Sequence, residues 1–215
     1  TDGHGVRQSD AARLVLLSAI WGASFIFIRV LAPVLGPVLT VTTRVLIGGA
    51  VLIVYCRAIG LDAGLARHWR QYALIGVANS TLPFMLFAFA ALHLPASYSV
   101  ILNAMTPLFT ALLAVPLLGE RLTAAKIAGL VVGVAGVALV SGAGPVVPDL
   151  RFALAVAACL GATLCYAGSS IYMKRYASGV KPLALAGWSQ IFAGLALVPL
   201  VPFAPPTGAI TPLIV

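Results

Sequence analysis

Charge is scarce in this sequence, and acidic residues are scarcer still. The 215 residues include 13 Lys or Arg and 5 Asp or Glu, which together make up 8% of the chain, whereas a soluble domain carries roughly 25% charged residues. Hydrophobic residues make up 61%. The composition therefore excludes an ordinary water-soluble enzyme.

Patterns typical of metal, redox or catalytic sites are also missing. Cys56, Cys159 and Cys165 lack the spacing of a zinc site and the even number of a disulfide framework. A membrane enzyme would need His, Asp or Cys residues within reach of one another, and the sequence has no such cluster. We therefore expect no metal, no cofactor and no enzymatic activity.

The net charge of +8 does not point to nucleic acid, because nucleic-acid-binding proteins gather Lys and Arg on one polar face. Here the basic residues separate apolar segments, and 71–119, 127–148, 152–173 and 182–215 contain no charge at all. A bilayer core about 30 Å thick needs roughly 20 apolar residues per helix. We predict an all-α polytopic transmembrane helical bundle in a lipid bilayer, with a loop over 57–70 and spans at 13–35, 37–56, 71–92, 96–118, 123–142, 151–174 and 183–203.

The distribution of basic residues predicts the orientation in the membrane. Cytoplasmic loops carry an excess of Lys and Arg. With a cytoplasmic N-terminal tail (1–12), the outer side receives only Arg29, Arg44 and Arg151, and the inner side receives Arg7, Arg13, Arg57, Arg67, Arg70, Arg121, Lys126, Lys174, Arg175 and Lys181. We therefore expect a multi-pass protein of the cell inner membrane with its N-terminus in the cytoplasm.

A weak internal repeat relates the first two spans to the last two at an offset of 145 residues. Corresponding spans are five spans apart, an odd number, so the second copy would cross the membrane in the opposite direction, as in the inverted repeats of many secondary transporters. The aligned pairs are Ser18 with Thr163, Trp21 with Tyr166, Ser24 with Ser169, Arg29 with Lys174, Pro37 with Pro182, and Gly49 with Gly194.

Several short motifs resemble the EamA-type permeases of the drug/metabolite transporter superfamily. These motifs are Trp21-Gly22-Ala23-Ser24-Phe25, the run from Ala91 to Tyr98, Pro107-Leu108, Leu118-Gly119-Glu120-Arg121-Leu122-Thr123, and the run from Gly129 to Gly136. The resemblance implies ten helices in two inverted five-helix halves with both termini cytoplasmic. On that basis 13–142 is a complete first half, 143–150 an outer loop, and 151–215 the first two helices of a second half that lacks three.

Polar side chains inside the spans are the candidates for a substrate site, because such groups are costly in lipid. Ser99, Asn103, Thr106 and Thr110 fall on one face of the fourth span at helical spacing. This stripe predicts either a cavity lining or hydrogen bonds between helices. Pro107 frees a backbone carbonyl beside it, which favours the cavity. Asn79, with Ser80 and Pro83, repeats the combination in the third span.

Two further stripes contain a hydroxyl, an aromatic ring and a base. Ser18, Trp21, Phe25 and Arg29 align in the first span, which also contains the candidate Ser24, and Thr163, Tyr166, Ser170 and Lys174 align in the sixth. The aromatic rings can hold a substrate or can be packing residues. Arg29 and Lys174 can be anchors at the helix ends, or Arg29 with Arg44 can draw a carboxylate into an outward-open vestibule.

The five acidic residues, Asp2, Asp10, Asp62, Glu120 and Asp149, all fall in predicted tails or loops. Proton-coupled export of cations normally needs a carboxylate within the membrane. The absence of one favours zwitterionic or anionic metabolites over cations. The resemblance to EamA-type permeases implies a permease for amino acids or related compounds, and we expect it to export them by alternating access. The alternatives are a proton-coupled exporter of drugs or quaternary ammonium compounds, and a seven-helix receptor or photoreceptor. Retinal would need a lysine inside the last span, and 183–203 has none.

The link between the fourth and fifth predicted spans has its own candidates. Glu120 can support a helix start that Thr123 caps, or it can form a cytoplasmic gate with Arg121. Gly129, Gly133 and Gly136 give the fifth span a small-residue face suited to close packing of helices or to a homodimer.

Overall fold

The computed structural model describes residues 8–120, 123–143, 149–206 and 208, and every regular element in them is helical. Five segments are long and apolar enough to cross a membrane, namely Val15–Ala58, Leu65–Ala91, Ala96–Leu118, Leu150–Tyr176 and Pro182–Phe203. The prediction of an all-α, multi-pass bundle is therefore confirmed. The elements in chain order are α1 (Gln8–Ala58), α2 (Leu65–Gly76), η1 (Val77–Thr81), α3 (Leu82–Ala91), α4 (Ala96–Asn103), α5 (Thr106–Leu118), α6 (Ala124–Ala143), α7 (Leu150–Tyr176), α8 (Pro182–Leu197) and η2 (Val198–Phe203).

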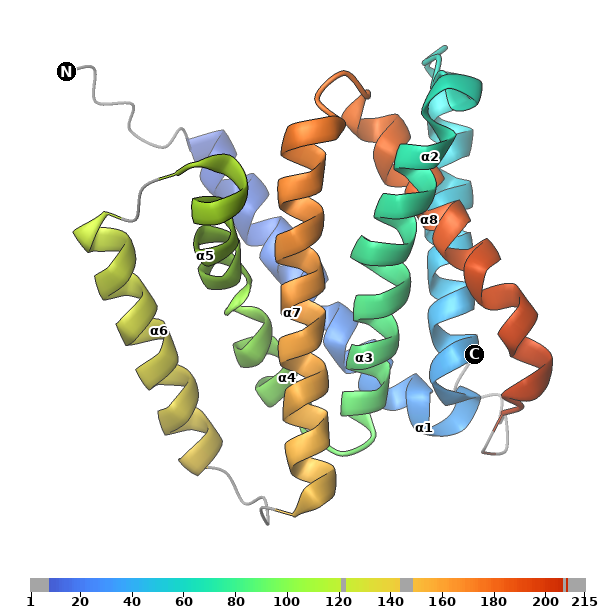
Figure 1. The fold of residues 1–215 in the computed structure, drawn as a ribbon. Helices are drawn as coiled ribbons and strands as arrows, with labels where there is room; N and C mark the ends of the chain where they lie inside the picture. The colour runs from blue at the N-terminus through green and yellow to red at the C-terminus, as the bar shows by residue number, and fades with distance from the viewer. Residues whose placement is uncertain (1–7, 121–122, 144–148, 207, 209–215) are drawn as a thin grey trace.

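The first two predicted spans are the two arms of α1, which turns back on itself at Gly36 (Figure 1). Gly36 has φ +76° and ψ 156°, a backbone conformation that glycine adopts without the steric cost of a Cβ. Pro33 and Pro37 lie on either side of it, and a proline inside a helix removes a backbone hydrogen bond. We call 8–35 the first arm and 37–58 the second arm.

The third span begins earlier than predicted. The expected loop over 57–70 is wrong beyond Gly64, because α2 already starts at Leu65 and carries Arg67 and Arg70 on its exposed side. These charges lower the hydropathy without preventing a helix, whose other face buries Tyr72 and Ile75. The span continues through the π-helical η1 into α3. A proline ring clashes with the carbonyl four residues before it, so Pro83 accounts for a widened turn here.

The fourth span, predicted as one helix over 96–118, is interrupted close to Pro107. Helix α4 ends at Asn103 and α5 begins at Thr106. The Asn103 carbonyl, which a non-proline residue at 107 would satisfy, instead accepts a hydrogen bond of 2.8 Å from the Thr106 hydroxyl. The Asn103 carbonyl therefore stays hydrogen-bonded at the break, which avoids the cost of an unpaired carbonyl in lipid.

Helix α7 runs through the bundle and packs against α3, α4 and α5. Their shared core contains the large side chains Phe87, Leu94, Tyr98, Leu102 and Tyr166. This packing positions Tyr166 of α7 beside the rings of α3, which is the arrangement on which the site described below depends.

Helix α8 packs along the second arm of α1 through small residues from both sides. A Cβ added to Gly49 would lie 3.0 Å from the backbone nitrogen of Ile191, and one added to Gly194 would overlap Leu46. Gly49 and Gly194 are 145 residues apart, and so are Leu46 and Ile191. Small residues allow helices in lipid to approach closely and gain van der Waals contact.

Helix α6 makes few contacts with the rest of the described chain (Figure 1). A Cβ added to Gly129, Gly133 or Gly136 would meet nothing within 4 Å. The expectation that these glycines bring helices close together is thus not met by any described helix of this chain. Gly129 and Gly133 instead line a cavity of about 300 Å³ beside α5, and a homodimer through this face stays a prediction.

Candidate functional site

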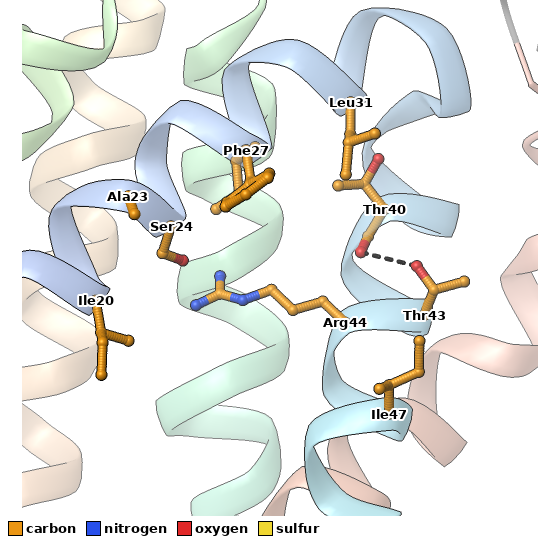
Figure 2. A pocket seen from close by; sticks show the side chains of 10 residues that line it. Ile20, Ala23, Ser24, Phe27, Leu31, Thr40, Thr43, Arg44 and Ile47 are labelled. Carbon is orange, nitrogen blue, oxygen red and sulfur yellow. Dashed lines mark hydrogen bonds between the residues drawn. The ribbon is translucent and has the colours of Figure 1, made fainter. Parts of the chain in front are cut away.

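A cavity of about 640 Å³ lies between the two arms of α1 (Figure 2). We call it the arginine cavity, because Arg44 of the second arm extends across it toward Ser24 of the first arm. The remaining side chains are apolar except for two threonines, and the whole lining comprises Ile20, Ala23, Ser24, Phe27, Ile28, Leu31, Thr40, Thr43, Arg44 and Ile47.

Aromatic rings surround the inner end of the Arg44 side chain. The guanidinium carbon lies 4.1 Å from the centroid of the Phe84 ring. Phe87 stacks on Tyr166 at 6.2 Å between centroids and meets Phe25 edge-on at 5.1 Å. A small space of about 20 Å³ joins these rings to Arg44 and Ser24. A cation over a ring face is attracted by the ring's quadrupole, so Phe84 holds the guanidinium in place while its N–H groups stay available.

Thr40 supplies a second polar group to the arginine cavity. The residue is 3% exposed, and its Oγ1 has no hydrogen-bond partner among the described residues. Its neighbour Thr43 instead donates to the carbonyls of Leu39, at 2.8 Å, and Thr40, at 3.2 Å. A buried polar atom without a partner is costly, so the Thr40 hydroxyl is suited to pair with a ligand.

A second polar cavity, of about 440 Å³, lies between α5, α6 and α7. We call it the lysine cavity, since Lys126 and Lys174 both line it and both pair with Glu120, at 3.3 Å and 2.7 Å. The hydrogen bond from Lys174, followed by that from Lys126, lowers the pKa of the Glu120 carboxyl below its ordinary value. Thr106, Thr110 and Ser170 supply hydroxyl groups to the same cavity.

Four of the predicted site residues therefore line one of the two cavities, and a fifth, Tyr166, lines the small space beside the arginine cavity. Ser24, Arg44 and Tyr166 meet around the arginine cavity and the small space beside it. Thr106 and Ser170 line the lysine cavity, where Glu120, a predicted gate residue, is also found.

Other predicted residues lie elsewhere. The Arg29 guanidinium donates to the carbonyl of Ala91 at the end of α3, so it does not share a cavity with Arg44. Ser99 is buried and accepts a hydrogen bond of 3.8 Å from the Cys159 thiol of α7, which joins two helices. Asn79 lies in η1 and Asn103 at the end of α4, and neither lines a described cavity. The Trp21 side chain and Arg121 lie outside what the structure describes.

The break after Asn103 explains why the predicted stripe of the fourth span does not act as one surface. The stripe assumes a continuous helix, but α4 and α5 are separate helices. Ser99 consequently packs against α7, whereas Thr106 and Thr110 face the lysine cavity. Ser99 thus takes part in a hydrogen bond between helices, whereas Thr106 and Thr110 line a cavity, and the stripe as a substrate site stays a prediction.

The link between α5 and α6 also differs in part from the expectation. Thr123 caps α6, since the Lys126 backbone N–H donates to its hydroxyl at 3.3 Å. Glu120 joins Lys126 and Lys174 instead of supporting the helix start. Lys174 had the pattern of an anchor, and no signal in the sequence predicts its pairing across 54 residues.

Phe84, Thr40 and Lys126 were not among the predicted site residues, for similar reasons. Phe84 is one of several phenylalanines in an apolar helix, and only the fold places it under Arg44. Thr40 lies close to Thr42 and Thr43, and no sequence pattern distinguishes it as the threonine whose hydroxyl has no partner among the described residues.

In the described residues no three His, Cys, Asp or Glu side chains come together as a metal site would require.

A multi-pass helical bundle whose polar groups line cavities between helices is typical of a membrane transporter. The model of the EamA-like transporter family matches residues 11–142. The chain belongs to this family, and the hypothesis of a seven-helix receptor or photoreceptor is therefore wrong.

Three curated relatives are similar to the chain. A protein of Streptantibioticus cattleyicolor named "Probable terminal-alkyne amino-acid exporter" is 32% identical over 61% of the chain and 44% of its own length. "Uncharacterized transporter YvbV" of Bacillus subtilis is 28% identical over 81% of the chain and 56% of its own length. "Protein PecM" of Dickeya dadantii is 27% identical over 84% of the chain and 59% of its own length. The chain thus spans about half the length of these relatives, and no solved structure matches it significantly.

Proposed function

We propose that the protein exports amino acids or closely related solutes that carry a carboxylate, by alternating access across the inner membrane. The observation that carries this proposal is the position of Arg44. Its guanidinium reaches into a cavity of about 640 Å³, and no Asp or Glu lies between residues 11 and 61 to neutralise it. A guanidinium binds a carboxylate through two parallel hydrogen bonds.

The other groups of the arginine cavity suit the rest of such a solute. The Thr40 hydroxyl has no hydrogen-bond partner within the described part of the chain, and Ser24 lies opposite Arg44 (Figure 2). Apolar side chains such as Ile20, Phe27 and Ile47 line the remainder and suit an aliphatic side chain. A relative named as an amino-acid exporter supports this class of substrate.

The direction and mechanism have separate support. Gly49 against Ile191 and Gly194 against Leu46 are the reciprocal contacts that a two-fold relation between the helices would produce, because both pairs follow the 145-residue offset. Inverted halves of this kind can rock about a central site. The name of one relative, an amino-acid exporter, supports export, and the excess of basic residues on one side supports a cytoplasmic N-terminus.

The arginine cavity argues against the alternative of a cation exporter. A bound drug cation would face the Arg44 guanidinium without a carboxylate among the described membrane-spanning residues to offset it. Like charges in a low-dielectric site repel strongly. The positive cavity therefore favours a zwitterion or an anion.

Counterflow in proteoliposomes tests the proposal with three matched probes. L-propargylglycine is an amino acid with a terminal alkyne, propargylglycinamide lacks its carboxylate charge, and 3-butyn-1-amine lacks the carboxyl group altogether. We expect the complete gene product to exchange the acid at least ten times faster than the amide or the amine. Faster exchange of the amine would contradict the proposal and favour a cation exporter.

A further inference from the structure

The lysine cavity holds one carboxylate between two ammonium groups. Glu120 Oε1 lies 2.7 Å from Lys174 Nζ, and Glu120 Oε2 lies 3.3 Å from Lys126 Nζ. Each oxygen is thus bound by a different lysine, one from α6 and one from α7. Because two cations face one anion, the cluster keeps an excess positive charge next to a cavity of about 440 Å³.

Hydroxyl oxygens extend the polar lining along the cavity. Thr106, Thr110 and Ser170 donate their protons to the backbone carbonyls of Asn103, Thr106 and Tyr166, at 2.8 to 2.9 Å. A hydroxyl oxygen that donates its proton keeps lone pairs with which it can accept. The cavity therefore offers ammonium donors for a carboxylate and hydroxyl acceptors for an amino group, which are the two ends of a zwitterion.

We propose that the lysine cavity is a second binding station for a carboxylate-bearing solute, and that Glu120 occupies its carboxylate position while the station is empty. This inference rests on the proposed function, since it assigns the same solute a second stop on its path. Binding exchanges one carboxylate for another between Lys126 and Lys174. The Glu120 side chain is 35% exposed, so water can solvate it once it is displaced.

The exchange has a structural consequence for the two parts of the chain. The Glu120 pair with Lys174 joins the α5–α6 link to the end of α7. A solute that displaces Glu120 removes this connection and leaves the weaker hydrogen bond of 3.2 Å from Arg175 to the Leu117 carbonyl. Filling the station therefore breaks the ion pair between Glu120 and Lys174, while α5 and α7 stay packed against each other.

Thermal unfolding of the purified complete gene product tests the station without measuring transport. Sodium propionate replaces sodium chloride at constant ionic strength, and the substitution Arg44→Gln removes the response of the arginine cavity. In the Arg44→Gln protein, we expect the further substitution Glu120→Gln to lower the propionate concentration for half-maximal stabilisation several-fold. The reason is that the Glu120 carboxylate no longer competes with propionate for the two lysines. Adding Lys174→Gln as well should abolish the response, and Lys181→Gln, outside the cavity, should not change it.

An identical propionate dependence with and without Glu120→Gln would overturn the inference, and so would a response that survives Lys174→Gln. If Arg44→Gln lowers the yield of folded protein, proteins with and without Glu120→Gln are compared with Arg44 retained. The propionate concentration for half-maximal stabilisation must then also be lower in the Glu120→Gln variant. If the propionate experiment fails while L-propargylglycine is still exchanged faster than its amide, only the second station is rejected. If L-propargylglycine is not exchanged faster than its amide, the proposed function is rejected, whatever the response to propionate.

Discussion

Gly194 of α8 lies directly against Leu46 of α1, with no room for a Cβ between them. Its counterpart 145 residues earlier, Gly49, meets Ile191 in the same interface. The two contacts hold the second arm of α1 against α8. Because Arg44 is on that arm, the interface also positions the arginine cavity.

The substitution Gly194→Ala should therefore destabilise the protein. Forcing a methyl group into a closely packed contact costs about 1–3 kcal/mol, and we expect a matching loss in the free energy of unfolding measured in mixed micelles. Gly48→Ala is the control, because a Cβ at Gly48 meets nothing within 4 Å. Equal stabilities of the two variants would mean that the contact between Gly194 and Leu46 is not close in the protein.

A hydrogen bond between α8 and η1 gives a second prediction. The buried Thr81 hydroxyl donates to the Ala193 carbonyl at 3.1 Å. The substitution Thr81→Val removes this hydroxyl and should lower the free energy of unfolding by about 0.6 kcal/mol, the average for hydrogen bonds between membrane helices. The double-mutant cycle with Gly194→Ala should show coupling, because both residues act at the α8 surface. Thr42→Val, whose hydroxyl bonds only within its own helix, should show no such coupling.

The ion pairs of Glu120 predict a dependence of stability on pH. Hydrogen bonds from Lys174 and Lys126 depress the pKa of Glu120 below its ordinary value of 4.5. The folded state therefore binds the proton less well than the unfolded state does, so the stabilisation is fully present above pH 4.5 and is lost as the pH falls through the depressed value.

The measurement is the difference in melting temperature between the wild type and Glu120→Gln as a function of pH. We expect the wild type to melt higher at neutral pH and the difference to vanish in strong acid. A difference that is constant with pH, or that grows as the pH falls, would contradict the assigned ion pairs.

Hydropathy and prolines were enough to predict most of the fold. Stretches without charge located the spans. The interruption between α4 and α5 was not predicted, although Pro107 indicated the carbonyl that is freed there. The start of α2 was missed because Arg67 and Arg70 lower the hydropathy of a turn that is nevertheless helical. Charged residues indicate where a segment leaves the lipid, but a helix can extend beyond the lipid into water.

The candidate site was predictable only in part. Arg44 and Ser24 stood out because polar residues are rare in these spans, and both line the arginine cavity. The contact of Arg44 with Phe84 depends on how α3 packs against α1, which no local pattern encodes. The same holds for Lys174 and Glu120, which lie 54 residues apart.

If Arg44 binds the carboxylate of the transported solute, exchange of L-propargylglycine by the complete gene product must depend on the Arg44 guanidinium. Arg44→Gln should lower the exchange rate at least tenfold with the protein still folded. Arg44→Lys should keep a part of it, because lysine retains the charge but not the planar fork. Arg151→Gln, at the start of α7, should exchange at the wild-type rate. Wild-type exchange by Arg44→Gln would contradict the account.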